Sequence, residues 1–507
     1  MTSLWWDRPP ILVDDDHGES YDDVVVGAGL TGLTLSVLLA RAGHRVLVVE
    51  ARHVGAVTTG HTTGKLSLLQ GTTYSDLLSR QSRPVVDAYV EANRDGQAWL
   101  LEFCATQAVP MQFRPAGTYA ADRAGGLRQA KAEHRAATAL GLPVRWTDDL
   151  AVPFPQFGAT VLDDQAQFDS MDVLAALTTD LRAAGGCIID QTRVVAVTYG
   201  HHPTLTFDNG RRVHADRVVL ATGTPVLDRG LYFAKLESKR SYALAFDHSD
   251  PPALMLLGAG SPSRSIRDAS LGSGRHLLVG GEGHPVGRTR SEATHLDRLR
   301  EWTAEYFPGA VETHAWSAQD YTSHDHIPFV GLLPRGGGST YLATGFNKWG
   351  MTNAVAAALN LHGQIIGAQP VWGRRMRRRI TRPRAAAGIV GMNVGVAAAM
   401  ATGYAKVALQ PLPDQPPAEG AGTVGRRGIL PVAQATVDGR TCAVSAVCTH
   451  LGGVLRFNDA EQSWDCPLHG SRFAITGEVL EGPATRPLRR LNQTPPPASP
   501  QPDPPKD

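Results

Sequence analysis

Cysteine is scarce in this sequence, and neither sign of charge is in excess. Five cysteines are spread over 507 residues, at positions 104, 187, 442, 448 and 466. They are too few for a disulfide framework and indicate a reducing compartment. The 49 basic and 48 acidic residues leave a formal net charge of +1, so no long-range field attracts nucleic acid. We expect a cytoplasmic protein that does not bind nucleic acid.

Long apolar runs are also rare. Residues 1–20 lack a basic start followed by an apolar core and a cleavage site, so we expect a lead-in and no secretory signal. Residues 385–405 carry no charge and follow a basic run, 374–379, as a short membrane span would. They are mostly Ala, Gly and Val, which makes insertion less favourable than packing on protein. A membrane partner is therefore disfavoured, although hydropathy alone does not separate the two.

The length of the chain predicts two or more domains, since it exceeds what one hydrophobic core usually supports. Residues 76–150 place Ala, Leu, Arg and Glu at helical spacing, and residues 239–330 contain short β-rich runs. Both are predicted insertions that form a substrate-side domain within residues 21–371. Residues 372–425 are predicted to be an interdomain helix and linker, residues 426–490 a small domain, and residues 491–507 a disordered Pro-rich tail.

Residues 21–50 have the pattern of a strand, a glycine turn, a helix and a second strand. Gly27, Gly29 and Gly32 form G-x-G-x-x-G at the turn. The first permits a tight turn, the second lets backbone approach a pyrophosphate, and the third lets helix and strand touch. Glu50 ends the second strand, where its carboxylate can accept hydrogen bonds from ribose hydroxyls. The unit predicts dinucleotide binding; the alternative is a glycine-rich turn without a ligand.

Two short motifs nearer the C-terminus each pair a cysteine with a histidine. Cys448 and His450 fit C-x-H, and Cys466 and His469 fit C-x-x-H. A Rieske [2Fe-2S] cluster needs two thiolates on one iron and two imidazoles on the other, presented by two loops. The two cysteines are therefore predicted to hold the inner iron and the two histidines the outer iron. The alternative is a zinc site, but zinc fingers usually place a cysteine pair before a histidine pair.

Over about residues 21–370 the sequence resembles the D-amino acid oxidase-like family of FAD-dependent oxidoreductases. The resemblance rests on the glycine fingerprint, GHTTGK at 60–65, ATG at 221–223 and ATGFNKWGMT at 343–352. It implies FAD, and a helix at about 351–366 whose positive N-terminal end faces the flavin pyrimidine. The implied cofactor contacts are Gly27, Gly29, Gly32, Glu50, Arg52, His61, Thr62, Thr63, Thr222, Gly223, Gly345, Gly350, Met351 and Thr352.

The cluster motifs depart twice from the Rieske proteins of cytochrome bc complexes, which they otherwise resemble. Those proteins have a disulfide between the loops, where this chain has Gly453 and Leu468. They also share a serine, here Ser471, but have a tyrosine two residues later, where this chain has Phe473. Losing a hydrogen bond to the cluster removes stabilisation from its reduced state. We expect a potential toward the low end of the roughly −150 to +300 mV Rieske range.

An FAD accepts two electrons together, whereas a Rieske cluster carries one at a time. The combination predicts oxidation of a small amine or amino acid by hydride transfer to the flavin, of the deaminating class that the family implies. Electrons would then pass singly through the cluster to an external protein or quinone. Lys348 and Arg267 are candidates for binding a substrate carboxylate or tuning the flavin, although a surface or structural charge is the favoured interpretation of both. Tyr242 and His284 are candidates for lining the substrate cavity, and a hydrogen-bonding role in the core is equally plausible for them.

Two other functions fit parts of this pattern. In an electron-transfer flavoprotein, a nicotinamide or a protein would reduce the FAD, but the chain has no second glycine fingerprint for NADH. A Rieske oxygenase needs a mononuclear iron in a large domain after the cluster, and about 38 residues follow His469. His324, Asp325 and His326 resemble such an iron site, but neighbours on an extended chain point to opposite sides. The expected fold is an α/β FAD-binding Rossmann-like domain with an inserted α+β substrate domain, followed by a small all-β Rieske domain.

Overall fold

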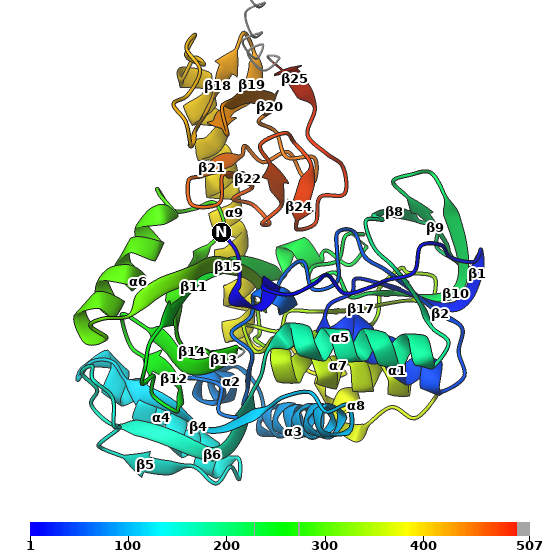
Figure 1. Cartoon of the computed structure of the whole chain (residues 1–507). Helices are drawn as coiled ribbons and strands as arrows, with labels where there is room; N and C mark the ends of the chain where they lie inside the picture. Colours follow the sequence, from blue (N-terminus) through cyan, green and yellow to red (C-terminus); the bar gives the residue numbers. More distant parts are fainter. Residues whose placement is uncertain (228, 272–273, 494–507) are drawn as a thin grey trace, which may run out of the picture. The chain divides into compact units, whose positions relative to one another are not determined.

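The computed structural model describes residues 1–227, 229–271 and 274–493 and divides into two compact units (Figure 1). The first unit comprises Met1–Pro285 and Ala293–Val394. The second comprises Val286–Glu292 and the chain from Gly395 onward. Seven residues that lie between two elements of the first unit in sequence therefore belong to the second.

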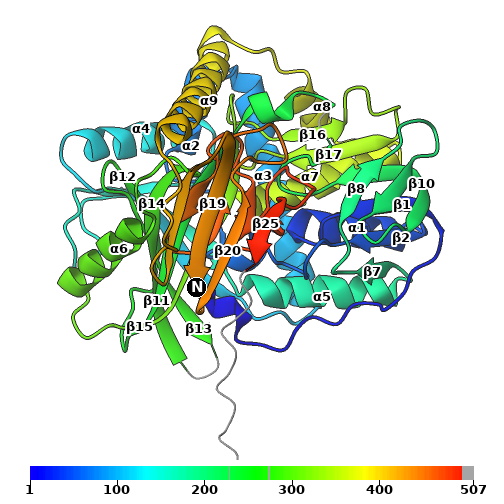
Figure 2. The same ribbon diagram turned by 90° about the horizontal axis from the view of Figure 1, so that it is seen from above.

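The predicted strand–helix–strand at 21–50 is present as β1 (Ser20–Val26), α1 (Leu30–Arg41) and β2 (Val46–Val49). The sheet order is β16, β17, β10, β1, β2 and β7, with β9 pairing to β10 and β8. β1 runs parallel to both β2 and β10, and β10 runs parallel to β17. Figure 2 shows β1, β2 and β7 side by side with α1 and α5. The remaining strands of this sheet are β7 (Cys187–Ile189), β8 (Val194–Val197), β9 (Thr204–Phe207), β10 (Arg212–Leu220), β16 (Phe329–Leu332) and β17 (Thr340–Thr344).

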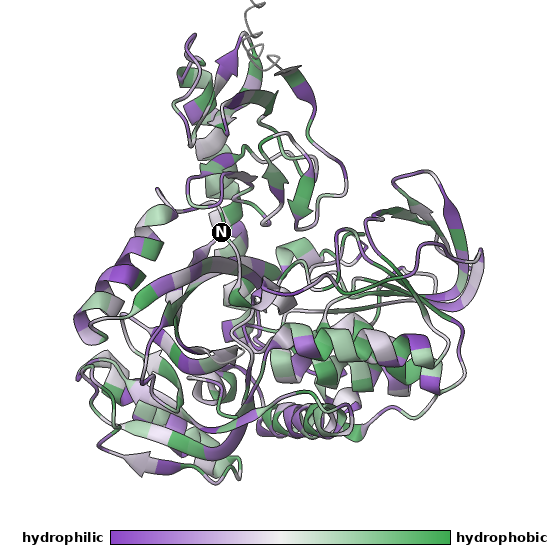
Figure 3. Ribbon diagram, viewed as in Figure 1, coloured by the Kyte–Doolittle hydropathy of each residue, from purple (hydrophilic) through white to green (hydrophobic). Residues whose placement is uncertain are grey.

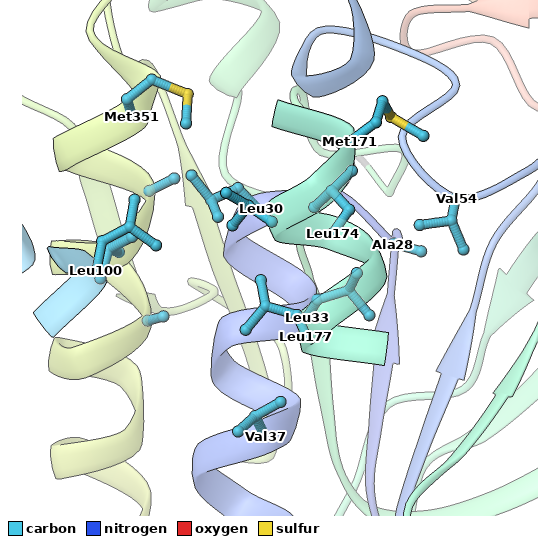
Figure 4. Packing of buried hydrophobic residues seen from close by; sticks show 14 of the residues in the cluster. Ala28, Leu30, Leu33, Val37, Val54, Leu100, Met171, Leu174, Leu177 and Met351 are labelled. Carbon is cyan, nitrogen blue, oxygen red and sulfur yellow. The ribbon is translucent and has the colours of Figure 1, made fainter. Parts of the chain in front are cut away.

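The central strands of this sheet are apolar on both faces, because one face packs against helices and the other against residues of β8, β9 and loops. All four residues of β2 are buried, with no alternation, as expected of a parallel strand covered on both sides. α1 contributes to one core with α5 (Ser170–Ala183) and α7 (Gly350–Ile365). Figure 4 shows Leu33 of α1 next to Leu177 of α5, and Met351 at the start of α7. Figure 3 shows both hydrophilic and hydrophobic residues along α5, because only one of its faces is buried.

The two predicted insertions contribute most of a second, nine-stranded sheet. Its order is β15, β11, β14, β13, β12, β4, β6 and β3, and β5 pairs with β6. Its strands are β3 (Lys65–Leu66), β4 (Gln112–Ala120), β5 (Arg145–Thr147), β6 (Ala159–Gln167), β11 (Leu236–Asp247), β12 (Met255–Ala259), β13 (Arg264–Leu271), β14 (Gly274–Pro285) and β15 (Val311–Ser323). The accompanying helices are α2 (Thr73–Arg80), α3 (Arg83–Thr106), α4 (Gly125–Ala139) and α6 (Ala293–Tyr306). Short 3₁₀ turns occur at Leu4–Trp6, Thr59–His61 and Tyr232–Ala234.

The second unit has two antiparallel four-stranded sheets around one small core. One sheet orders β18 (Ala421–Arg427), β19 (Leu430–Val437), β20 (Arg440–Ser445) and β25 (Arg490–Gln493). The other orders β21 (Arg456–Asn458), β22 (Ser463–Asp465), β23 (Arg472–Ala474) and β24 (Val479–Glu481). Trp464 and Phe473 are fully buried between them and pair across β22 and β23. These sheets and the two in the first unit confirm the expected fold class.

Two predicted boundaries move. β18 begins at Ala421, inside the predicted linker, and β25 extends to Gln493, past the predicted start of the tail at residue 491. Residues 491–493 belong to the sheet because β25 pairs with β20. The composition of the tail did not indicate this pairing. The rest of the predicted tail, 494–507, lies outside the described residues.

Between the units the chain forms α8 (Val371–Arg377) and α9 (Pro383–Leu409). Within the described ranges, α9 is the one helix that is long and apolar enough to cross a membrane, judged by length and composition. Its first half makes contacts in the first unit, where Asn393 donates to the Ala234 carbonyl at 2.9 Å. Its second half makes contacts in the second unit, where Tyr404 donates to the Gly452 carbonyl at 2.8 Å. Both halves thus have protein partners.

Candidate functional site

The three fingerprint glycines meet three different steric demands. Gly27 has a φ of +110°, and a Cβ there would lie 2.5 Å from the Ala221 oxygen. A Cβ on Gly32 would lie 2.0 Å from the Gly27 oxygen, so only glycine lets α1 contact the turn after β1. At Gly29 the nearest atom to such a Cβ is the Thr59 hydroxyl, at 3.2 Å. The turn is therefore closed at its base and open where a pyrophosphate would approach the helix.

Glu50 is held at the end of β2 by backbone donors. Its carboxylate accepts hydrogen bonds from the backbone N–H groups of Ala28 and Arg52, both at 2.9 Å. Burial raises the pKa of Glu50, and the two N–H groups act in the opposite direction. The acid lies directly beside the glycine turn, as the ribose-binding role requires. Arg52 takes part through its backbone.

The segment after β2 is fixed by its carbonyl groups. The Trp316 indole donates to the His61 oxygen at 2.8 Å, and the Trp5 indole donates to the Thr62 oxygen at 2.6 Å. The carbonyl of Thr63 accepts a hydrogen bond from Arg267. Thr59 of the same segment reaches back to α1, because its hydroxyl accepts from the Leu30 N–H at 3.2 Å. These bonds place the predicted contacts 61–63 next to the glycine turn.

Two further glycine turns meet at the carboxyl ends of β10 and β17. Gly223 and Gly345 have φ values of +77° and +82°, and the Thr344 hydroxyl donates to the Gly223 oxygen at 2.5 Å. Thr222 uses its side chain within its own turn, donating to the Thr224 carbonyl at 2.6 Å. Ligands of open α/β sheets bind at such strand ends, so both turns border the same site as Gly27.

The chain enters α7 through a strained turn. Asn347 and Lys348 have φ values of +49° and +67°, a left-handed conformation that costs non-glycine residues energy and is often found at functional sites. α7 then begins at Gly350, and its N-cap, Trp349, makes no capping hydrogen bond through its side chain. The Trp349 side chain therefore leaves the first N–H groups of α7 uncapped.

A buried polar network behind this helix was not predicted from the sequence. The Thr352 hydroxyl donates to Asn93 at 2.5 Å and accepts from the Gln70 amide at 3.1 Å. Tyr89 donates to Gln70 at 2.7 Å and accepts from Asn353 at 3.0 Å. The Thr352 side chain is therefore used inside the protein, and only its backbone N–H can serve the predicted cofactor contact. No local pattern marks these residues, because their partners lie far apart in sequence.

Tyr242 and His284 lie side by side on neighbouring strands. Both were predicted to line the substrate cavity, which requires them to be close. The Tyr242 hydroxyl lies 3.2 Å from Nε2 of His284. The rings of His284 and His295 stack with centroids 4.4 Å apart. His295 in turn contacts Glu282 at 2.9 Å, and Arg264 contacts the same carboxylate at 2.8 Å. Glu282 and His295 were not predicted.

Lys348 lies against the same two strands. Its ammonium bonds to the Ser241 hydroxyl and lies 3.6 Å from an oxygen of Asp320. It also lies 3.0 Å from where a Cβ on Gly283 would be, so the glycine before His284 leaves room for it. Asp320 was not predicted. Burial raises its pKa, and the charges of Lys348 and Lys239 lower it.

Arg267 lies elsewhere on the second sheet. Its guanidinium donates to the carbonyls of Asp268, at 2.8 Å, and Thr63, and lies over the Trp5 ring. Burial lowers its pKa to about 10. The structure thus brings three of the four predicted substrate-side residues together, and places the fourth where it binds the segment at 61–63.

In the second unit, two loops repeat the same hydrogen-bonded turn. Cys448 N–H donates to the Gly453 oxygen at 2.8 Å, and Cys466 N–H donates to the Ser471 oxygen at 2.8 Å. Four residues after each cysteine a glycine, 452 or 470, takes a φ of +75° and donates back to the cysteine carbonyl. The matched turns present their cysteines in equivalent positions.

The four predicted cluster ligands converge from these loops. Cys466 donates a hydrogen bond to the Cys448 sulfur, and with N–H groups of the loop and the Ser471 hydroxyl this lowers the pKa of Cys448 to about 7. The rings of His450 and His469 lie 5.2 Å apart at 88°. Burial lowers the pKa of each to about 4, so both are neutral, as metal ligands must be. Two thiols and two imidazoles on facing loops fit a diiron cluster.

No three His, Cys, Asp or Glu side chains within residues 1–227, 229–271 and 274–493 converge on a single metal ion. In a [2Fe-2S] cluster of this type each iron binds only two protein ligands. The carboxylate of Asp325 pairs with Arg379 at 2.5 Å, and His326 contacts Asp76 at 2.5 Å, so these two side chains of the motif at 324–326 are used in separate contacts. None of the five cysteines, all of which lie within the described ranges, forms a disulfide.

Comparison with known proteins identifies both domains. The profile of the DAO family, described as FAD dependent oxidoreductase, matches residues 22–361, and that of the Rieske [2Fe-2S] domain matches residues 416–494. A putative Rieske 2Fe-2S iron-sulfur protein, YhfW of Bacillus subtilis, is 30% identical over 95% of both chains.

Solved structures show the same oxidase fold. Glycine oxidase from Geobacillus kaustophilus is similar with a TM-score of 0.58 and 20% identity, over 70% of this chain and 96% of that one. L-amino acid deaminase from Proteus vulgaris is similar with a TM-score of 0.58 and 14% identity, over 73% and 99%. With these profiles and the YhfW match, the chain belongs to the DAO family of FAD-dependent oxidoreductases and carries a C-terminal Rieske domain that binds a [2Fe-2S] cluster.

Proposed function

We propose that this oxidoreductase oxidises the C–H bond next to nitrogen in a small amino acid or amine, and that the electrons leave singly through the cluster to an external acceptor. FAD, when bound, accepts both electrons of such a bond, and the cluster passes them on one at a time. The cytoplasmic location predicted from the free cysteines stays a prediction.

The position of Lys348 carries the proposal. This residue lies two positions before Gly350, at which α7 begins, and its ammonium reaches Ser241 and Gly283. Ser241 and Gly283 immediately precede Tyr242 and His284. The cation of Lys348 thus lies between the turn that is predicted to face the cofactor and the strands that carry Tyr242 and His284. That is a suitable position for holding a substrate carboxylate while its α-carbon faces the flavin.

Asp320 would keep this lysine in place. Its side chain is mostly buried, and one carboxylate oxygen lies 3.6 Å from the ammonium. The other oxygen is buried and has no hydrogen-bond partner among the described residues. A buried carboxylate without a nearby cation is costly, so Lys348 and Asp320 stabilise each other. An incoming carboxylate would share the lysine with Asp320, which favours small substrates with one carboxylate.

Anaerobic mixing with panels of D- and L-amino acids, the matching decarboxylated amines, and NADH tests the proposal. Flavin bleaching and the EPR signal of the reduced cluster are the readouts. For Lys348→Gln we expect the amino acid concentration for half-maximal bleaching to rise about tenfold or more, and the value for an amine to change little. Lys131→Gln, on the surface of α4, is the matched control.

Two outcomes would contradict the proposal. Equal effects of Lys348→Gln on amines and amino acids would remove the carboxylate-binding role. Bleaching by NADH alone would favour the alternative, in which a nicotinamide or protein donor reduces the FAD and the chain is an electron-transfer flavoprotein.

A further inference from the structure

The segment Val286–Glu292 is built into the cluster unit, although it continues β14 and leads into α6 of the first unit. Ser291 donates to Asp459 at 2.6 Å, and the Glu292 N–H donates to the same carboxylate at 2.7 Å. Gly287 has a φ of +64°, and a Cβ there would lie 3.1 Å from the backbone nitrogen of Pro467. The segment therefore packs directly on the second ligand loop.

Arg288 makes the specific contact within this segment. Its Nε donates to the Pro467 carbonyl at 2.9 Å. Pro467 lies between the ligands Cys466 and His469, so this bond fixes the backbone of the loop that carries both. The guanidinium also lies close to α9, 2.9 Å from where a Cβ on Gly395 would be. The side chain is held on two sides and is only partly exposed.

We propose that Arg288 is a positioning residue for the cluster: it holds the second ligand loop through the Pro467 carbonyl, and its positive charge favours the reduced, more negative cluster. An Arg guanidinium keeps its charge at any physiological pH, and in a partly buried place that charge is weakly screened. A strand of the oxidase domain thus continues into a segment that sets how readily the cluster accepts an electron.

The neighbouring Arg290 provides a matched control. It lies two residues along the same segment, carries the same charge and is exposed. Arg288→Gln removes the charge and keeps an amide donor. Arg288→Lys keeps the charge but not the guanidinium geometry.

The test is a potentiometric titration of the full-length holoprotein, with EPR of the reduced cluster as the readout and no substrate present. We expect Arg288→Gln to weaken electron binding by about three- to tenfold, which lowers the midpoint potential by about 30 to 59 mV for a one-electron couple. We expect Arg288→Lys to keep most of the potential but broaden the EPR signal, because the loop is less well fixed. Arg290→Gln should leave both unchanged.

An unchanged potential in Arg288→Gln, or an equal shift in Arg290→Gln, would overturn the proposal. Iron and sulfide content of each variant shows whether the cluster is assembled. If Arg288→Gln assembles no cluster, the potential of Arg288→Lys decides: a fall of less than about 30 mV supports the role of charge, and a fall of about 30 mV or more contradicts it. Since no substrate is used, these results do not depend on the proposed amine oxidation.

Discussion

A Cβ atom on Gly453 would lie 2.6 Å from Cγ of Leu468, so the two positions that form a disulfide in the cytochrome bc proteins face each other here as well. The same Cβ would lie 2.9 Å from Sγ of Cys466. Close packing of glycine against leucine thus joins the two cluster loops without a covalent bond.

Gly453→Ala should therefore impair the cluster. The added methyl must displace Leu468 and the Cys466 ligand, and overpacking of this kind typically costs about 1 to 3 kcal/mol. We expect a clear loss of iron and acid-labile sulfide per chain while the flavin content stays unchanged. Adding Leu468→Ala removes one of the two clashes and should restore part of the cluster. Full iron content in the single variant would contradict this interpretation.

Hydrogen bonds to sulfur should tune the potential. The Ser471 hydroxyl bonds to the Cys448 sulfur and is itself oriented by the Ala484 N–H at 3.1 Å. Ser471→Ala should lower the midpoint potential, and Phe473→Tyr should raise it if the new hydroxyl reaches the cluster, each tenfold change in electron affinity being about 59 mV.

Thr449→Val is the control for this pair. Thr449 lies in the first ligand loop, but its hydroxyl donates to the Arg486 carbonyl at 2.6 Å. Its removal takes away a bond that anchors the loop but none to sulfur, so the potential should shift much less than in Ser471→Ala. A potential of the unaltered protein near +300 mV would show that the serine alone is sufficient, against the low value predicted from Phe473.

The parts of the fold and site that could be predicted are those coded by local spacing. The glycine fingerprint and the apolar strands around it predicted β1, α1 and β2. The spacing of the ligands predicted the cluster, because each of two short loops carries one cysteine and one histidine close together in sequence. Each of these features depends on residues within about thirty positions of one another.

The residues that were missed act across long stretches of chain. Arg288 and Pro467 are 179 positions apart, and Gln70 and Thr352 are 282 positions apart. Asp320 appears as an ordinary polar residue in a strand until the turn before α7 brings Lys348 beside it. Only tertiary packing creates these pairs, so no periodicity or motif could indicate them.

Two glycines of the fingerprint should separate cofactor binding from folding. Gly29→Ala leaves its new methyl 3.2 Å from the Thr59 hydroxyl, which can shift. The methyl would take up space where the fingerprint predicts a pyrophosphate to approach. We expect a folded protein with little FAD. Gly32→Ala would place its methyl 2.0 Å from the Gly27 oxygen, which is backbone and cannot move freely. We expect that variant to be insoluble or strongly destabilised; FAD content and circular dichroism measured together distinguish the two outcomes.

Glu133 should make the stability of the first unit depend on pH. This acid of α4 accepts hydrogen bonds from the N–H groups of Tyr74, at 3.0 Å, and Ser75, at 2.8 Å, at the start of α2. Burial raises its pKa from 4.5 to about 7. Its folded pKa is above its unfolded value, so its favourable contribution is complete below about pH 4.5 and is lost as the pH rises toward 7.

One pKa unit is about 1.4 kcal/mol, so the loss amounts to about 3 kcal/mol by pH 8. Glu133→Gln cannot ionise, and it keeps an oxygen for one of the two N–H groups. We expect the unaltered protein to lose stability relative to this variant between pH 5 and pH 8. The measurement is the temperature at which flavin fluorescence is released on heating. Parallel pH profiles for the two proteins would show that Glu133 stays ionised in the fold, in which case its two N–H donors outweigh the cost of its burial.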